Sequence, residues 1–163
     1  MANPISQTPS QPNKSLAQES NQGSNKGSDT GSGDFAAMEQ AIYQQVNQYR
    51  ADQNLPPLKS NPQIAQQSRN HSLAIARGQV PMGHTGFERR ADIIGQSIPY
   101  QQIAENVAFN SGYNDPAIEA VKGWIKSDGH RRNIKGEYDL TGVGVARNPQ
   151  GEYYFTQIFV HSR

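Results

Sequence analysis

The chain has 163 residues, a formal net charge of +1 and no cysteine, which excludes a disulfide framework and a cysteine-ligated metal. Its lysines and arginines are scattered, so nucleic-acid binding is not expected, and the pair Arg89-Arg90 is interpreted as a solvated helix face. The sequence contains no run of about 18 apolar residues that could span a membrane. We also expect no signal peptide, because Met1 to Pro4 lack a charged start and an apolar stretch.

Composition divides the chain into two regions. Residues 1–33 are mostly Ser, Asn, Gln, Gly, Thr and Pro and contain no aromatic residue. Such a segment cannot bury enough apolar surface to offset the entropy lost on ordering, so we predict a disordered polar linker or tail. Residues 34–163 are numerous enough for one compact domain with a single core.

Apolar side chains at three- and four-residue spacing predict four helices in this domain. They cover residues 34–52, 62–78, 87–94 and 115–128. Asp34 is the expected N-cap of the first helix, and Ser60 or Asn61 that of the second. Gly129 is expected to end the fourth helix.

Two strands are predicted at the end of the chain, over residues 141–147 and 153–161. The turn between them contains Gly151, which supplies a positive φ and favours a hairpin. Helices that come first and a hairpin that comes last, within one domain, indicate the α+β class.

Histidines are the first candidates for chemistry. His71 falls inside the second predicted helix, where a hydrogen-bonded core residue is expected. His84 and His130 instead lie in glycine-flanked breaks between elements, where functional groups are usually placed. The alternative for each is a capping role, in which His130 interacts with the dipole of the helix before it.

Glu105 has apolar neighbours, and a buried carboxylate is costly unless it is paired. It either bonds to backbone amides of a nearby loop or faces two imidazoles. Two histidines and one carboxylate can bind a divalent cation and leave a position open for water.

The run Ser127-Asp128-Gly129-His130 contains the three residue types of a hydrolase triad. Triad residues normally converge from separate elements, and the chain has no Gly-x-Ser-x-Gly elbow. Capping and turn chemistry therefore explain this run better than nucleophilic catalysis does.

Four segments occur in an order and spacing that resemble the CAP superfamily of SCP-like proteins, in its bacterial branch. They are Gly83-His84-Thr85, Ala104-Glu105-Asn106-Val107, the run from Trp124 to Ile134, and Gly142-Val143-Gly144-Val145-Ala146. This superfamily includes cysteine-rich secretory proteins, insect antigen five and plant pathogenesis-related proteins. The resemblance implies an α/β/α sandwich, in which a small antiparallel sheet lies between helical layers and a cleft opens on one side.

The resemblance also implies a set of site residues. CAP domains carry two histidines and two glutamates in the cleft, and in some members the histidines bind zinc. Three of the four match His84, Glu105 and His130, whereas Ser127 stands where the second glutamate is usual. The implied ligand-binding cleft is thus His84, Glu105, Ser127 and His130, with His84 and His130 as ligands of a divalent metal such as zinc. The missing carboxylate weakens the attraction for a dication.

Three functions remain open at this point. The first is a non-enzymatic binding module for a small-molecule, lipid or cell-envelope ligand, secreted or held at the cell envelope as the resemblance implies. The second is a metal-assisted, peptidase-like hydrolase with Glu105 as general base and the metal on His84 and His130. The third is a structural or interaction module. Fold alone does not decide between them.

Overall fold

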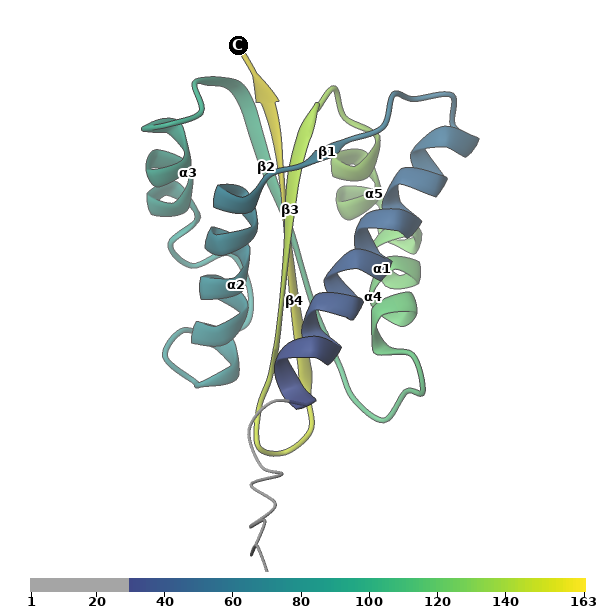
Figure 1. Cartoon of the computed structure of the whole chain (residues 1–163), viewed down its shortest axis with the longest axis vertical. Coiled ribbons are helices and arrows are strands. Elements are labelled where there is room, and N and C mark those ends of the chain that lie inside the picture. The colour runs from purple at the N-terminus through teal and green to yellow at the C-terminus, as the bar shows by residue number, and fades with distance from the viewer. Residues whose placement is uncertain (1–29) are drawn as a thin grey trace, which may run out of the picture.

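The computed structural model describes residues 30–163, which form three layers with a sheet between two groups of helices (Figure 1). Helices α2 and α3 cover one face of the sheet, and α1, α4 and α5 cover the other. The elements are α1 (Thr30–Asp52), β1 (Lys59–Ser60), α2 (Pro62–Ala76), α3 (Phe87–Gly95), β2 (Tyr100–Asn110), α4 (Pro116–Lys126), α5 (Asp128–Lys135), β3 (Leu140–Arg147) and β4 (Tyr153–Ser162). This arrangement confirms the predicted α+β class and α/β/α sandwich.

The sheet has the strand order β1-β3-β4-β2, so β2 is an edge strand. Strands β2, β4 and β3 pair antiparallel, as expected, and the predicted hairpin is β3–β4. The short β1 pairs parallel with β3 over two residues, which makes the sheet mixed rather than purely antiparallel. Strand β2, over residues 100–110, is an element that the sequence pattern does not predict.

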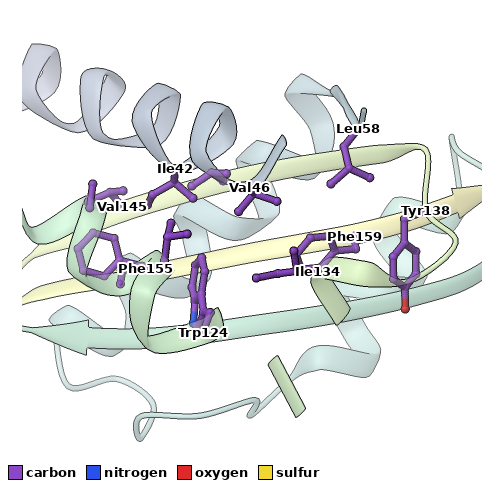
Figure 2. Close-up of a cluster of buried hydrophobic side chains, with 13 residues drawn as sticks. Ile42, Val46, Leu58, Trp124, Ile134, Tyr138, Val145, Phe155 and Phe159 are labelled. Atoms are coloured by element: carbon purple, nitrogen blue, oxygen red, sulfur yellow. The ribbon is translucent and has the colours of Figure 1, made fainter. Parts of the chain in front are cut away.

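The main hydrophobic core lies between the sheet and the layer of α1, α4 and α5 (Figure 2). Trp124 of α4 meets Phe155 and Phe159 of β4 and Ile42 of α1 there, and all four are buried. A smaller cluster on the opposite face contains Ile64, Ile94, Ile158 and Val160. Alternate residues of β4 thus face opposite layers, as the period of a strand requires.

Helix α2 lies unusually close to β3 because the strand carries glycine at the two contact positions. Ser68 Oγ donates to the Gly142 carbonyl at 2.9 Å, and Ser72 Oγ donates to the Gly144 carbonyl at 2.9 Å. A Cβ added to either glycine would lie 2.1 Å from a backbone nitrogen of α2. The glycine-rich strand motif therefore allows backbone to pack against backbone.

Two buried charged residues attach α1 to the rest of the domain. Glu39 accepts two hydrogen bonds from the Arg69 Nε and Nη2 atoms, at 2.9 and 2.6 Å, and one from the Val145 amide at 3.2 Å. Arg50 is 1% exposed, and burial lowers its pKa. Its guanidinium donates to the backbone carbonyls of Pro56, Ile134, Gly136 and Tyr138.

Two predicted helix boundaries are wrong. Helix α1 begins at Thr30, so Asp34 lies inside it and is not an N-cap. The fourth predicted helix ends at Lys126, because Ser127 has extended backbone angles (φ −89°, ψ 122°) that separate α4 from α5. Gly129 lies within α5 and does not end α4.

The predicted start of the second helix agrees with the structure. Asn61 is the N-cap of α2, and its Oδ1 accepts from the amides of Gln63 and Ile64. The predicted division between residues 33 and 34 falls within α1, and the part of the predicted tail before Thr30 lies outside the described residues. In the described part of the chain, no helix combines the length and apolarity needed to cross a membrane.

Candidate functional site

A buried carboxylate on β2 is the centre of the candidate site. Glu105 is 5% exposed, and both of its oxygens are occupied. Arg90 of α3 donates from Nε to Oε2 at 2.8 Å and from Nη2 to Oε1 at 2.7 Å. His84, in the loop before α3, places Nδ1 2.9 Å from Oε1. A bidentate, charge-assisted pair of this kind is among the strongest that a protein makes.

The burial of Arg90 corrects the expectation of a solvated Arg89-Arg90 face. Arg90 is 8% exposed and shares the buried face of α3 with Ala91 and Ile94, whereas Arg89 is exposed. Its Nη1 also donates to the Thr85 carbonyl at 2.9 Å. The four-residue spacing of Arg90 and Ile94 is the local signal that could have predicted this orientation.

Glu105 therefore matches neither expected environment completely, which were a loop of backbone amides and a pair of imidazoles. Its side-chain partners are Arg90 and His84, not the backbone amides of a loop, and no hydrogen bond joins its side chain to His130 within residues 30–163. Because an ionised carboxylate can only accept, Nδ1 of His84 donates, and the neutral ring then carries an acceptor at Nε2. The His84 side chain is about half exposed, so this ring is open to a ligand.

His130 lies within α5 and not, as expected, in a break between elements, and a network of side-chain amides fixes α5 against β2. The Asn106 side chain donates from Nδ2 to the His130 carbonyl at 3.1 Å. Asn133 donates from its own Nδ2 to Asn106 Oδ1 at 2.9 Å and to the Glu105 carbonyl at 3.3 Å. The sequence carries no signal for the roles of Asn106 and Asn133, because only the packing of α5 on β2 brings the two side-chain amides together.

Ser127 and His130 line a groove of about 370 Å³ between α4 and the end of β2. His84 and Glu105 are not among its lining residues. Burial is the main cause that lowers the pKa of His130, and repulsion from a protonated His84 adds to it. The bond from Asn106, the residue after Glu105, to the His130 carbonyl places His130 beside β2. The structure thus brings the four predicted cleft residues together as two adjacent pairs, His84 with Glu105 and Ser127 with His130.

These residues do not fit the divalent metal site that the family resemblance implies. No group of three or more His, Cys, Asp or Glu side chains able to hold a metal occurs among residues 30–163. Arg90 places a positive charge on both oxygens of Glu105, and Ser127 supplies no second carboxylate. Zinc sites in proteins normally use three or four imidazole, thiolate or carboxylate ligands, and His84 and His130 alone do not make such a set.

His71 confirms the expectation of a hydrogen-bonded core histidine. It is buried in α2, and its Nε2 lies 2.6 Å from the Gly83 carbonyl, so Nε2 carries the hydrogen. This bond anchors the loop that carries His84 and thereby helps to position the exposed imidazole.

Acidification is expected to destabilise the fold through His71 and His130. Burial is the main cause that lowers the pKa of each below the ordinary value of 6.5. The folded state then binds fewer protons than the unfolded state, so this stability is complete above pH 6.5 and is lost as the pH falls through the folded pKa. The urea midpoint should fall between about pH 7.5 and pH 5.5.

The matched control for that titration is His71→Gln, because a glutamine amide can still donate to the Gly83 carbonyl but does not titrate. It should flatten the pH dependence of the urea midpoint. An equally steep dependence in this variant would contradict the role assigned to His71.

Comparison with known proteins shows which family model and which bacterial proteins this chain is similar to. The model of the CAP family, described as "Cysteine-rich secretory protein family", matches residues 43–159. The uncharacterized protein YkwD of Bacillus subtilis is 28% identical over 133 residues, which are 77% of this chain and 48% of that protein.

Two solved bacterial structures have the same fold. One is an extracellular protein containing an SCP domain from Bacillus anthracis, with a TM-score of 0.62, 24% identity, and coverage of 78% of this chain and 41% of that one. The other is a cysteine-rich secretory protein from Staphylococcus aureus, with a TM-score of 0.60, 26% identity, and coverage of 78% and 39%. This chain spans less than half the length of each of these three proteins.

Proposed function

This chain belongs to the CAP family of cysteine-rich secretory proteins, and from that premise we propose that it is a secreted or surface-held domain that binds a ligand without chemical turnover. The extracellular location of the similar Bacillus anthracis protein supports this placement. The proposed ligand is a small-molecule, lipid or cell-envelope component, bound on the face that carries His84, Glu105, Ser127 and His130.

The occupancy of Glu105 is the observation that carries the proposal. A general base must reach the proton that it removes, directly or through one water. The Glu105 carboxylate is buried, and Arg90 and His84 already occupy both of its oxygens. Its proposed role is to orient His84, whose exposed ring contacts the ligand.

Metal-assisted hydrolysis is the weaker alternative for the same residues. It requires a cation close to Glu105, where the Arg90 guanidinium already lies 2.7 and 2.8 Å from the carboxylate oxygens. Repulsion between this guanidinium and a dication adds to the loss of a carboxylate at Ser127. The electrostatics of the site therefore favour ligand binding without a metal.

A zinc titration tests the proposal. We expect the His84 and His130 imidazole NMR signals not to shift together at micromolar zinc, and the melting temperature to stay constant, since only a ligand bound by the folded state raises it. His71 and His161 are internal references for nonspecific binding. A pool of quenched fluorescent peptides should remain uncleaved with and without zinc.

Ser127→Glu is the matched variant, because it restores the second carboxylate of the family pattern. A joint shift of both imidazoles that appears only in this variant would show that the titration detects a metal site when one is present. A joint shift in the unmodified protein, with a higher melting temperature and peptide cleavage, would overturn the proposal in favour of the hydrolase.

A further inference from the structure

We propose that the groove between β2 and α4 binds an extended acidic peptide, which adds to the sheet as a further strand beside β2. This inference rests on the proposed binding function and names the class of ligand. The groove contains Ser127 and His130 at one end and extends along β2 toward Tyr113.

The backbone of β2 offers unpaired hydrogen-bonding groups to this groove. No strand pairs with its outer side, because β2 is the last strand of the sheet. The Glu105 carbonyl accepts from the Asn133 side chain of α5 rather than from β4. Alternate residues of a strand direct their backbone groups to the same side, so Val107 and Phe109 also direct theirs outward.

The register of the neighbouring strand leads to the same assignment. The Val160 carbonyl on β4 accepts from the amide of Asp139, the residue before β3. The backbone groups of Val160 therefore point toward β3. The preceding residue, Phe159, therefore points its backbone groups toward β2, where it pairs with Ala104. The backbone groups of Ala104 therefore point inward to β4, and those of the odd-numbered residues of β2 point outward, away from the sheet.

The shape of the groove fits a polypeptide strand. It holds about 370 Å³, and consecutive residues 107–110 line one wall. Gly123 of α4 lines the other wall, and a Cβ added to it would meet no atom within 4 Å. Tyr113 also lines the groove and is 54% exposed, which is unusual for an aromatic ring of this size.

Unpaired buried polar atoms provide a second, independent indication of a ligand. Within residues 30–163, three buried side-chain atoms have no hydrogen-bond partner, and two of them belong to residues that line this groove. They are the Trp124 Nε1 donor and the Asn110 Oδ1 acceptor. A peptide backbone carries both the carbonyl and the amide needed to satisfy them after small side-chain shifts.

The charges along the groove favour an acidic peptide. Its acidic lining residue, Glu119, is already paired with Lys122 at 2.9 Å. Lys126 also lines the groove and has no acidic partner within 4.0 Å in the described part of the chain.

Binding of defined peptide pools tests this inference on the full chain. One pool carries glutamate at alternate positions of a heptapeptide and a mixture of Val, Ile, Thr and Tyr between them, and a matched pool carries lysine instead. Fluorescence anisotropy should show binding of the acidic pool, and the amide NMR signals of Val107 and Phe109 should shift. N-methylation of the peptide at alternate positions should weaken binding in one register only.

Two variants of the protein locate the contact. Gly123→Met extends a side chain into the groove from a Cβ that meets no atom within 4 Å, and methionine favours the helix. This variant should keep the melting temperature and weaken binding about tenfold. Phe109→Pro removes an outward amide, whereas Phe109→Ala keeps that amide. The proline variant should therefore bind the acidic pool about fivefold more weakly than the alanine variant.

The outcomes separate this inference from the proposed function. Cleavage of the bound acidic peptides would overturn the function without turnover and leave the groove assignment intact. Absence of binding, equal binding of the lysine pool, or insensitivity to Gly123→Met would overturn the inference. Sedimentation that shows a dimer dissociated by Gly123→Met would also overturn the inference, because the groove would then be occupied by a second copy of the chain. In each of these cases, a ligand bound at His84 without turnover would still support the proposed function.

Discussion

Replacing Gly144 with alanine is expected to destabilise the domain by about 3 kcal/mol or more, which can abolish folding. The added Cβ would lie 2.1 Å from the Arg69 nitrogen and 2.2 Å from the Ser68 carbonyl carbon. Both are backbone atoms of α2, so relief requires the whole helix to move. That movement would lengthen the bond from Ser72 to the Gly144 carbonyl and open the core beneath α2.

Urea unfolding measures this loss, and Gly123→Ala is the matched control. No atom lies within 4 Å of a Cβ added at Gly123, which lies in α4. Alanine there should stabilise the fold by up to about 1 kcal/mol through helix propensity. If Gly144→Ala lost less than about 1 kcal/mol, α2 would be able to slide over β3, and the close contact would not be a constraint.

Replacing Arg90 with leucine is expected to cost about 3–5 kcal/mol, because it leaves the buried Glu105 carboxylate without its main charged partner. His84 would keep one hydrogen bond to the carboxylate but is half exposed and cannot replace the bidentate guanidinium. The loss measures the penalty of an uncompensated buried charge, not the net contribution of the ion pair.

A double-mutant cycle distinguishes the penalty of the uncompensated charge from the net contribution of the ion pair between Arg90 and Glu105. Glu105→Leu alone should also destabilise, since it leaves Arg90 buried without a partner, whereas the double variant Arg90→Leu/Glu105→Leu should recover much of the loss. Urea unfolding at about pH 7 gives the four free energies that the cycle needs. Simple additivity of the two single changes would show that the pair is not coupled and that Glu105 is stabilised in another way.

The helices and the hairpin could be predicted because their signals are local. Apolar spacing located α2 to within two residues of its end, and alternation placed Phe155 and Ile158 on opposite faces of β4. Strand β2 could not be predicted in this way. Its buried central residues, Glu105 and Asn106, are polar, and only contacts with distant α3 and α5 satisfy them.

The candidate site was predicted in part. The family resemblance indicated His84, Glu105, Ser127 and His130, and the structure places these residues in two adjacent pairs. It could not indicate Arg90, whose partner lies 15 residues away on another element. The sequence around Arg90 is rich in charge, and the four-residue spacing from Ile94 is the local signal that separates the buried Arg90 from the exposed Arg89.

The anchoring of α1 has a consequence for the order in which the domain assembles during synthesis. Arg50 bonds to carbonyls 84 to 88 residues further along the chain, and Glu39 bonds to an amide 106 residues further. Arg69, the charged partner of Glu39, follows it by only 30 residues. A ribosome nevertheless makes α1 first and the Ile134, Gly136 and Tyr138 carbonyls near the end, so most partners of the Arg50 charge are missing until nearly the whole chain has emerged. Assembly of the domain is therefore expected to occur in one late step and not progressively as the chain emerges.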